Sequence, residues 1–129
     1  MIRARKLLVG AAILSFGQAA SAHHSFAAFF DSQKMVTVKG VVTSYHFTNP
    51  HGLIAIDVRA ADGQIEHWRA ETNAPAVLSR RGWTPETLKA GDVVTLNGWA
   101  ARDGTRYLRL RQANRADGSV IGIPFDMTG

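Results

Sequence analysis

The fold follows from residues 35–47, MVTVKGVVTSYHF, a long run rich in valine and threonine. Apolar and polar residues alternate along it. Val36, Val38 and Val42 fall on one face, and Thr37 and Lys39 fall on the other. Because side chains alternate across a strand with a period of two, this pattern predicts a long strand with one buried face.

A glycine interrupts this predicted strand at position 40. An interior glycine is typical of a bulge or a sharp coil, which lets one strand serve two edges of a sheet. After Phe47 the composition changes to that of a turn, Asn49-Pro50-His51-Gly52. The first strand therefore ends in a turn that carries a histidine.

Two further strands follow the turn. Residues 53–60 alternate between apolar and polar side chains, and the Asp62-Gly63 pair after them is the sequence signal of a hairpin. Residues 64–71 then return as a third strand that carries Trp68. The first half of the domain is thus predicted to be a three-stranded meander.

The period changes after the third strand, where a short helix is predicted over residues 74–81. Asn73 is a candidate N-terminal cap, and Pro75 falls in the first turn, where its missing N–H group costs nothing. Gly82 follows as a stop signal. A helix therefore separates the meander from the rest of the chain.

Two more strands complete the predicted domain, with the hairpin sequence 102–105 between them and Asp117-Gly118 leading into a short segment over residues 120–123. The order strand, strand, strand, helix, strand, strand is that of the OB-fold. We therefore predict an all-β domain with one short helix, a small five-stranded OB-fold-like Greek-key barrel. Another small antiparallel barrel or sandwich with a helical crossover has the same order of elements. Apolar positions that share a buried face are Ile54, Ile56, Val58, Val94, Leu96, Ala100, Leu108 and Leu110.

Residues 1–22 have the organisation of a secretory signal peptide. A basic start precedes an apolar run over residues 7–16, and a small-residue cleavage site ends at Ala22. The sequence predicts cleavage after Ala22 and a periplasmic or secreted bacterial protein, with an uncleaved N-terminal anchor as the alternative. The mature chain then consists of an arm, residues 23–34, and a barrel domain, residues 35–129, with no membrane span.

The charge of the mature chain is close to neutral. The full sequence has 15 Lys and Arg residues against 10 Asp and Glu residues, a net charge of +5, but three of the basic residues lie in the predicted signal peptide. Without them the net charge is +2, which predicts that nucleic acid is not a partner. The chain has no cysteine, so hydrophobic burial must stabilise it without disulfides.

Four of the five histidines gather in two places, His23-His24 and His46 with His51. Cleavage after Ala22 frees the α-amine of His23, which then offers an amine and an imidazole nitrogen to one metal ion. A further imidazole from His51, His24 or His46 completes a nitrogen-rich set of the histidine-brace type, which suits Cu(II). Copper or another divalent metal is therefore the candidate cofactor. The alternative is that these histidines are polar residues of an exposed arm and that His51 fixes its own turn.

A second candidate site is a ligand-binding face on the barrel. Tyr45, Trp68 and Trp99 could form a stacking platform of the kind that OB-folds use, and Arg109 and Arg111 belong to a basic stripe on the last hairpin. Such a face would bind a glycan or a periplasmic protein partner, with no metal. The structural alternative is that the aromatics pack in the core or rim and that the arginines form a solvated outer strand face.

Conventional enzyme motifs are absent from the sequence. There is no cysteine nucleophile, no G-x-S-x-G elbow, no H-E-x-x-H pair and no phosphate-binding loop. We therefore predict no catalytic residues and a binding module rather than an enzyme. An oxidative copper enzyme built on the same nitrogen ligands remains the third alternative.

Linked motifs run along nearly all of the mature chain: His23-His24-Ser25-Phe26, Lys39-Gly40-Val41-Val42, Thr48-Asn49-Pro50-His51, Trp68 with Glu71, Leu78 with Arg81-Gly82-Trp83, Gly91-Asp92 and Ala101-Arg102-Asp103-Gly104. With these motifs the chain resembles a family of secreted bacterial proteins known as domain of unknown function 6152. It departs from the family pattern at His46-Phe47, where an aromatic such as tryptophan is usual. The resemblance implies a small periplasmic OB-like barrel and implies no particular activity.

Overall fold

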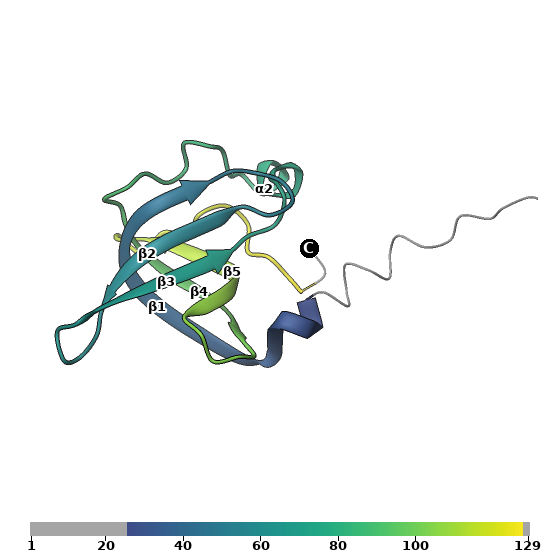
Figure 1. The fold of residues 1–129 in the computed structure, drawn as a ribbon. Coiled ribbons are helices and arrows are strands. Elements are labelled where there is room, and N and C mark those ends of the chain that lie inside the picture. Colours follow the sequence, from purple (N-terminus) through teal and green to yellow (C-terminus); the bar gives the residue numbers. More distant parts are fainter. Residues whose placement is uncertain (1–25, 128–129) are drawn as a thin grey trace, which may run out of the picture.

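The computed structural model describes residues 26–127 and contains a five-stranded closed barrel with a short helix between its third and fourth strands (Figure 1). Around the barrel the strands follow the order β1-β2-β3-β5-β4. The predicted fold class is confirmed, and the five strands and the helix between the third and fourth follow the predicted order. A further helical turn over residues 26–29, which the sequence pattern did not predict, precedes β1. The elements are β1 (Phe30–His46), β2 (Leu53–Arg59), β3 (Ile65–Glu71), α2 (Pro75–Arg80), β4 (Val93–Ala101) and β5 (Tyr107–Arg115).

Strand β1 serves two edges of the sheet, as its glycine predicts. Its first part pairs with β4 and its last part pairs with β2, and Val41 lies opposite both Val93 and Asp57. A Cβ atom at Gly40 would lie 2.3 Å from the main-chain oxygen of Asp57, so only glycine allows this close approach. The bulge itself falls later, between Val42 and Ser44.

Strand β1 also begins at Phe30, whereas the sequence pattern placed its start at Met35. Residues 30–34 lack the alternation of a strand, and the pairing with β4 is irregular between Phe30 and Met35. Phe30 is nevertheless buried and lies opposite Ala101. Tertiary burial of one phenylalanine therefore extends the strand where local propensity does not.

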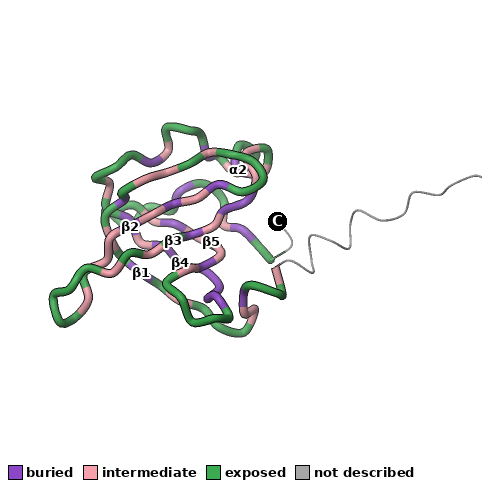
Figure 2. Tube along the Cα trace, in the orientation of Figure 1, coloured by how far each residue is buried: buried purple, intermediate pink, exposed green. Residues whose placement is uncertain are grey.

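Buried positions recur along the strands of the barrel (Figure 2), and most of the hydrophobic positions that alternation predicted belong to the core. Burying one such side chain stabilises the fold by about 1.5–3 kcal/mol, so this set supplies most of the driving force in a chain without disulfides. Helix α2 adds Leu78 to the same core. Fully buried residues include Ile54, Ile56, Leu78, Leu96, Leu108 and Leu110.

The cap predicted for α2 is wrong. The N-terminal cap residue is Ala74, which makes no side-chain capping bond, and Asn73 lies before it with a buried side-chain oxygen that has no hydrogen-bond partner within residues 26–127. Pro75 is in the first turn as predicted. Gly82 has a φ of +87° and directly follows the helical C-cap, so the predicted stop signal is confirmed.

The chain after β5 folds back without forming another strand. The expected segment over residues 120–123 contributes only an isolated bridge between Asn114 and Val120. Phe125 is buried against Trp83. No helix within residues 26–127 is long and apolar enough to cross a bilayer.

Candidate functional site

A row of neighbouring residues crosses four strands of the barrel. Glu71 on β3 lies opposite Leu53 on β2 and opposite Arg109 on β5, and Arg109 lies opposite Trp99 on β4. Since Leu108, the neighbour of Arg109, is fully buried in the core, Arg109 points to the outer face of the barrel. Strand pairing therefore brings a carboxylate, a guanidinium and an indole together on one outer surface.

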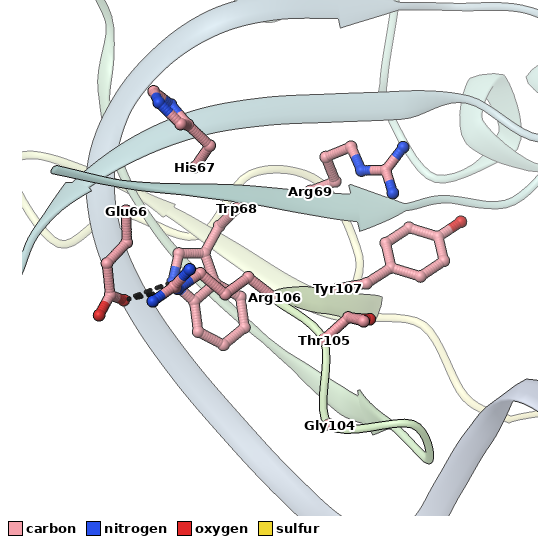
Figure 3. A pocket seen from close by; sticks show the side chains of 8 residues that line it. All are labelled: Glu66, His67, Trp68, Arg69, Gly104, Thr105, Arg106 and Tyr107. Carbon is pink, nitrogen blue, oxygen red and sulfur yellow. Dashed lines mark hydrogen bonds and ion pairs between the residues drawn. The ribbon is translucent and has the colours of Figure 1, made fainter.

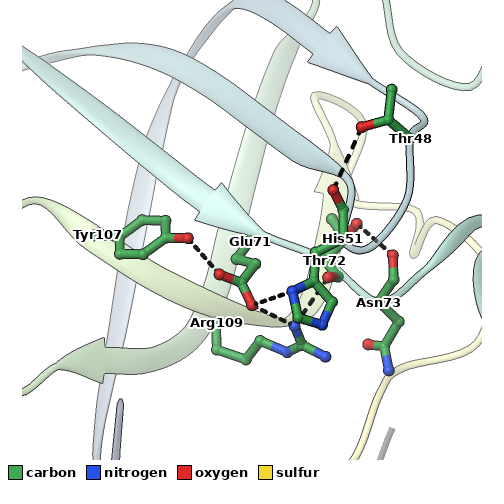
Figure 4. A network of polar contacts seen from close by, with 7 residues as sticks. All are labelled: Thr48, His51, Glu71, Thr72, Asn73, Tyr107 and Arg109. Atoms are coloured by element: carbon green, nitrogen blue, oxygen red, sulfur yellow. Dashed lines mark hydrogen bonds and ion pairs between the residues drawn. The ribbon is translucent and has the colours of Figure 1, made fainter. Parts of the chain in front are cut away.

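Glu71 is the centre of a polar network on this surface (Figure 4). Arg109 Nη1 donates to Glu71 Oε1 at 2.8 Å and to the main-chain oxygen of Thr72 at 2.9 Å, and the Tyr107 hydroxyl donates to Glu71 Oε2 at 2.5 Å. Only 19% of the Glu71 side chain and 12% of the Arg109 side chain are exposed. Both charges are thus largely removed from water and depend on each other.

Burial also shifts the pKa values of Tyr107 and Arg109, which both contact Glu71. Burial raises the pKa of Tyr107, and the hydrogen bond to Glu71 raises it further. Burial lowers the pKa of Arg109, while the charge of Glu71 opposes this shift. At neutral pH, Tyr107 is therefore a neutral hydrogen-bond donor.

His51 reaches this network from the turn between β1 and β2. Its Nδ1 atom lies 3.0 Å from Glu71 Oε1, and 45% of its side chain is exposed. The turn is closely packed, because a Cβ atom at Gly52 would lie 2.4 Å from Thr72 Oγ1. With Nδ1 facing Glu71, the opposite ring nitrogen, Nε2, faces away from the carboxylate. The geometry is that of a carboxylate–histidine pair.

The end of the N-terminal arm packs on the other side of the row. The ring of Phe26 contacts Trp99 edge to face, with ring centroids 5.6 Å apart, and its centroid lies 5.7 Å from that of Phe30. Phe30 in turn packs against Tyr107 at 5.4 Å. Phe26 and Phe30 thus dock on the barrel, whereas 66% of Phe29 is exposed. The arm therefore enters the barrel beside the Glu71 network.

The remaining histidines lie in different positions. His46 is exposed at the end of β1, opposite Leu53. His67 is 81% exposed and pairs with Asp57 at 2.6 Å. Within residues 26–127, no three His, Asp or Glu side chains are arranged to hold a metal ion. The predicted ligands His23 and His24 lie outside the described residues.

The residues of the predicted ligand-binding face do not form one platform. Trp99 is buried and lies opposite Arg109, which belongs to the Glu71 network. The Tyr45 hydroxyl donates to the main-chain oxygen of Thr84 at 3.0 Å. Arg111 is exposed farther along β5. Among the three aromatic residues of this face, Trp99 is thus the one that lies opposite Arg109, and Tyr45 and Trp68 lie on other strands.

Trp68 lies in an open groove of about 650 Å³ (Figure 3). One wall is β3 over residues 66–69, and the other is the turn into β5 over residues 104–107. Trp68 Nε1 donates to Glu66 Oε2 at 3.0 Å, and Arg106 Nε lies 3.4 Å from the same oxygen. The sequence showed Trp68 and the turn separately, but nothing in it indicated that they face each other.

The closed five-stranded barrel, with a helix between its third and fourth strands, defines a small OB-fold protein. Similarity to solved structures agrees with that class. Mitochondrial single-stranded DNA-binding protein Rim1 from S. cerevisiae superposes with a TM-score of 0.51 at 14% identity, over 64% of this chain and 93% of that chain. A small single-stranded DNA-binding protein from Streptomyces coelicolor gives a TM-score of 0.42 at 15% identity, over 64% of this chain and 90% of that chain. At 14% identity the likeness to Rim1 is one of fold.

The chain belongs to DUF6152, a family of unknown function, whose family model matches residues 11–109. The resemblance seen in the motifs is thereby confirmed. No curated protein matches the chain.

The prediction that nucleic acid is not a partner is wrong. It rested on net charge, yet a solved structure with this fold, Rim1, is a single-stranded DNA-binding protein. Net charge does not describe a local surface. The groove beside β3, for example, is lined by Arg69 and Arg106 although the chain as a whole is nearly neutral. The near-neutral composition therefore excludes no class of polymer.

Proposed function

We propose that this protein is a periplasmic binding module that holds Cu(II) through the processed N-terminus. His23 would supply its α-amine and imidazole, and His51 would supply a further imidazole. His24 and His46 are the alternative sources of that nitrogen. The observation that carries the proposal is the 3.0 Å contact between His51 Nδ1 and Glu71 Oε1.

A carboxylate partner of this kind is what metal-binding histidines usually have. The bond to one ring nitrogen fixes the orientation of the imidazole and raises the basicity of the other nitrogen. Glu71 is itself held by Arg109 and Tyr107, so the carboxylate cannot turn away without breaking two further hydrogen bonds. His51 Nε2 is thereby preorganised as a ligand.

The docked arm supports the participation of His23. Phe26 packs on Trp99, which is two strands away from Glu71 in the row across the barrel. Neighbouring strands lie about 4.8 Å apart. The three residues from His23 to Phe26 span up to about 10 Å when extended. An extended segment of this length is comparable to the two strand spacings between Trp99 and Glu71, which supports a site that His23 would share with His51.

The choice of copper follows from the donor atoms. An amine with two imidazoles is a nitrogen-rich set, which suits the tetragonal geometry of Cu(II). The chain contains no cysteine, so a thiolate zinc site cannot form. The glycan-binding alternative has less support, because Tyr45, Trp99 and Arg109 are each engaged in contacts within the protein.

The test is Cu(II) titration of the protein purified from periplasm, with its first residue established by mass spectrometry. We expect His23 as that residue, a nitrogen-rich EPR spectrum, and loss of roughly 10- to 100-fold in affinity for both His51→Ala and Glu71→Gln. His67→Ala is the matched control, because His67 also pairs with a carboxylate. A chain with methionine before His23 should bind weakly. Equal affinity in the His51→Ala and His67→Ala proteins would refute the proposed site.

A further inference from the structure

Strand β3 is paired on both sides along only part of its length. Its pairing with β5 covers Arg69, Ala70 and Glu71, which lie opposite residues 107–109. Its pairing with β2 covers the whole strand, from Ile65 to Glu71. Within the described chain, the first half of β3 therefore has a neighbouring strand on one side and an open edge on the other.

The hydrogen bonds at its two ends show which groups point to the open edge. The amide of Ala60 donates to the main-chain oxygen of Gln64, and the amide of Thr72 donates to the main-chain oxygen of Gly52. The main-chain N–H and C=O groups of even-numbered residues of β3 therefore point toward β2. The main-chain groups of odd-numbered residues point away from β2. The hydrogen bond of 3.0 Å from the amide of Arg69 to the main-chain oxygen of Arg106 confirms this direction. The main-chain groups of Ile65 and His67 thus point outward from the pair. Neither has a backbone partner on that side among residues 26–127.

The open edge forms one wall of the groove that contains Trp68 (Figure 3). The opposite wall is the turn into β5, so the groove lies where β5 would continue if it began earlier. Unpaired main-chain groups beside a groove are the features that accept an added strand. The exposed side chain of Ile65, at 45%, provides an apolar contact at the end of the edge.

The charges around the groove favour an acidic partner. Arg69 and Arg106 line it against a single carboxylate, Glu66, which already accepts from Trp68 and pairs with Arg106. The side chain of Arg106 is more than half exposed. A carboxylate of an incoming segment can therefore pair with either arginine at the mouth of the groove.

We propose that the open edge of β3 binds an extended acidic peptide segment of a partner protein as an added strand. The main-chain groups of Ile65 and His67 would bond to the peptide backbone, and Arg69 and Arg106 would select its acidic side chains. This surface is separate from the proposed copper ligands, so each proposal can fail without the other.

The test uses the mature protein and a short peptide of alternating Asp and Val residues, with an alternating Lys and Val peptide as the control. We expect the Asp-containing peptide to protect the amides of Ile65 and His67 from hydrogen exchange, as measured by NMR. Equal binding of the Lys-containing peptide would overturn the proposal. Two other results would also overturn it. Protection that rises with protein concentration in the absence of peptide would indicate pairing with a second copy of the chain. Protection by a single-stranded oligonucleotide but not by the peptide would indicate a nucleic-acid ligand.

Two pairs of variants separate edge pairing from surface attraction. His67→Pro removes an N–H group that β2 does not use, and should abolish binding, while His67→Ala retains the amide and should bind normally. Arg106→Glu should weaken binding at least about tenfold, since it replaces attraction by repulsion, whereas Arg111→Glu, outside the groove, should not. A circular dichroism spectrum and a urea unfolding midpoint like those of the unaltered protein would show that all four variants are folded. Normal peptide binding by folded His67→Pro would refute strand addition.

Discussion

The Tyr107 hydroxyl donates to Glu71 across the seam between β3 and β5, which is the shortest strand pairing in the described barrel and runs parallel. Only three residues on each strand form this seam. Arg109 joins the same carboxylate from the same strand as Tyr107. Side-chain bonds therefore reinforce the barrel where its backbone ladder is shortest.

Loss of the carboxylate should destabilise the barrel more than loss of the hydroxyl. Glu71→Ala leaves Arg109 largely buried and unpaired, and should lower the free energy of unfolding by about 3 kcal/mol or more. Tyr107→Phe removes one hydrogen bond and should cost about 1–2 kcal/mol. Urea unfolding of the metal-free protein measures both. Glu86→Ala, an exposed carboxylate, should change stability by less than about 0.5 kcal/mol, and a comparable loss there would contradict the role of the seam.

Phe26 and Phe29 provide a matched pair for the docking of the arm. Phe26→Ala should expose the Trp99 indole, shift tryptophan emission to longer wavelength and lower stability by about 1–2 kcal/mol. Phe29→Ala should change neither quantity, since 66% of Phe29 is already exposed. Identical spectra for the two variants would mean that Phe26 does not cover Trp99 in solution.

Neither of the two tyrosines should ionise near pH 10 in the folded protein. Burial, with a smaller contribution from Glu86, raises the pKa of Tyr45 to about 12, and the pKa of Tyr107 is also raised. Both folded pKa values exceed the unfolded value of 10.0. The contribution of the neutral tyrosines to the free energy of unfolding is therefore complete below pH 10 and is lost as the pH rises toward 12. Tyrosinate absorbance during an alkaline titration, compared with the urea-unfolded chain, measures this. The Tyr45→Phe and Tyr107→Phe variants assign each transition to one tyrosine. Folded and unfolded chains that titrate at the same pH would disprove the raised pKa values.

Gly40→Ala should destabilise the fold, because its Cβ atom would meet the main-chain oxygen of Asp57, which cannot rotate away. We expect a loss of about 1–3 kcal/mol in thermal unfolding. Lys39→Ala, an exposed neighbour on the same strand, is the control and should be nearly neutral. Equal losses in the two proteins would argue against close strand contact at position 40.

Local sequence patterns predicted the barrel because each strand has one buried face, as at Ile54 and Leu108. They could not predict the Glu71 network. Its members lie on β3 and β5, strands far apart in the sequence that become neighbours only when the barrel closes. The cap assigned to Asn73 failed for a similar reason. Its side chain is buried in the folded protein and does not cap the helix, which begins after Ala74. His51 was found because a turn signal marked it, but its carboxylate partner was not.

The two-sided pairing of β1 has a consequence for the biogenesis of the protein. Residues 30–41 lie against β4, which begins only at Val93. While the chain is being synthesised, this half of β1 cannot pair with β4 until most of the sequence has emerged from the ribosome. Its valine-rich face is exposed in the meantime, which is a hazard for aggregation. We therefore expect that truncation before β4 yields a chain that depends on chaperones rather than a smaller folded domain.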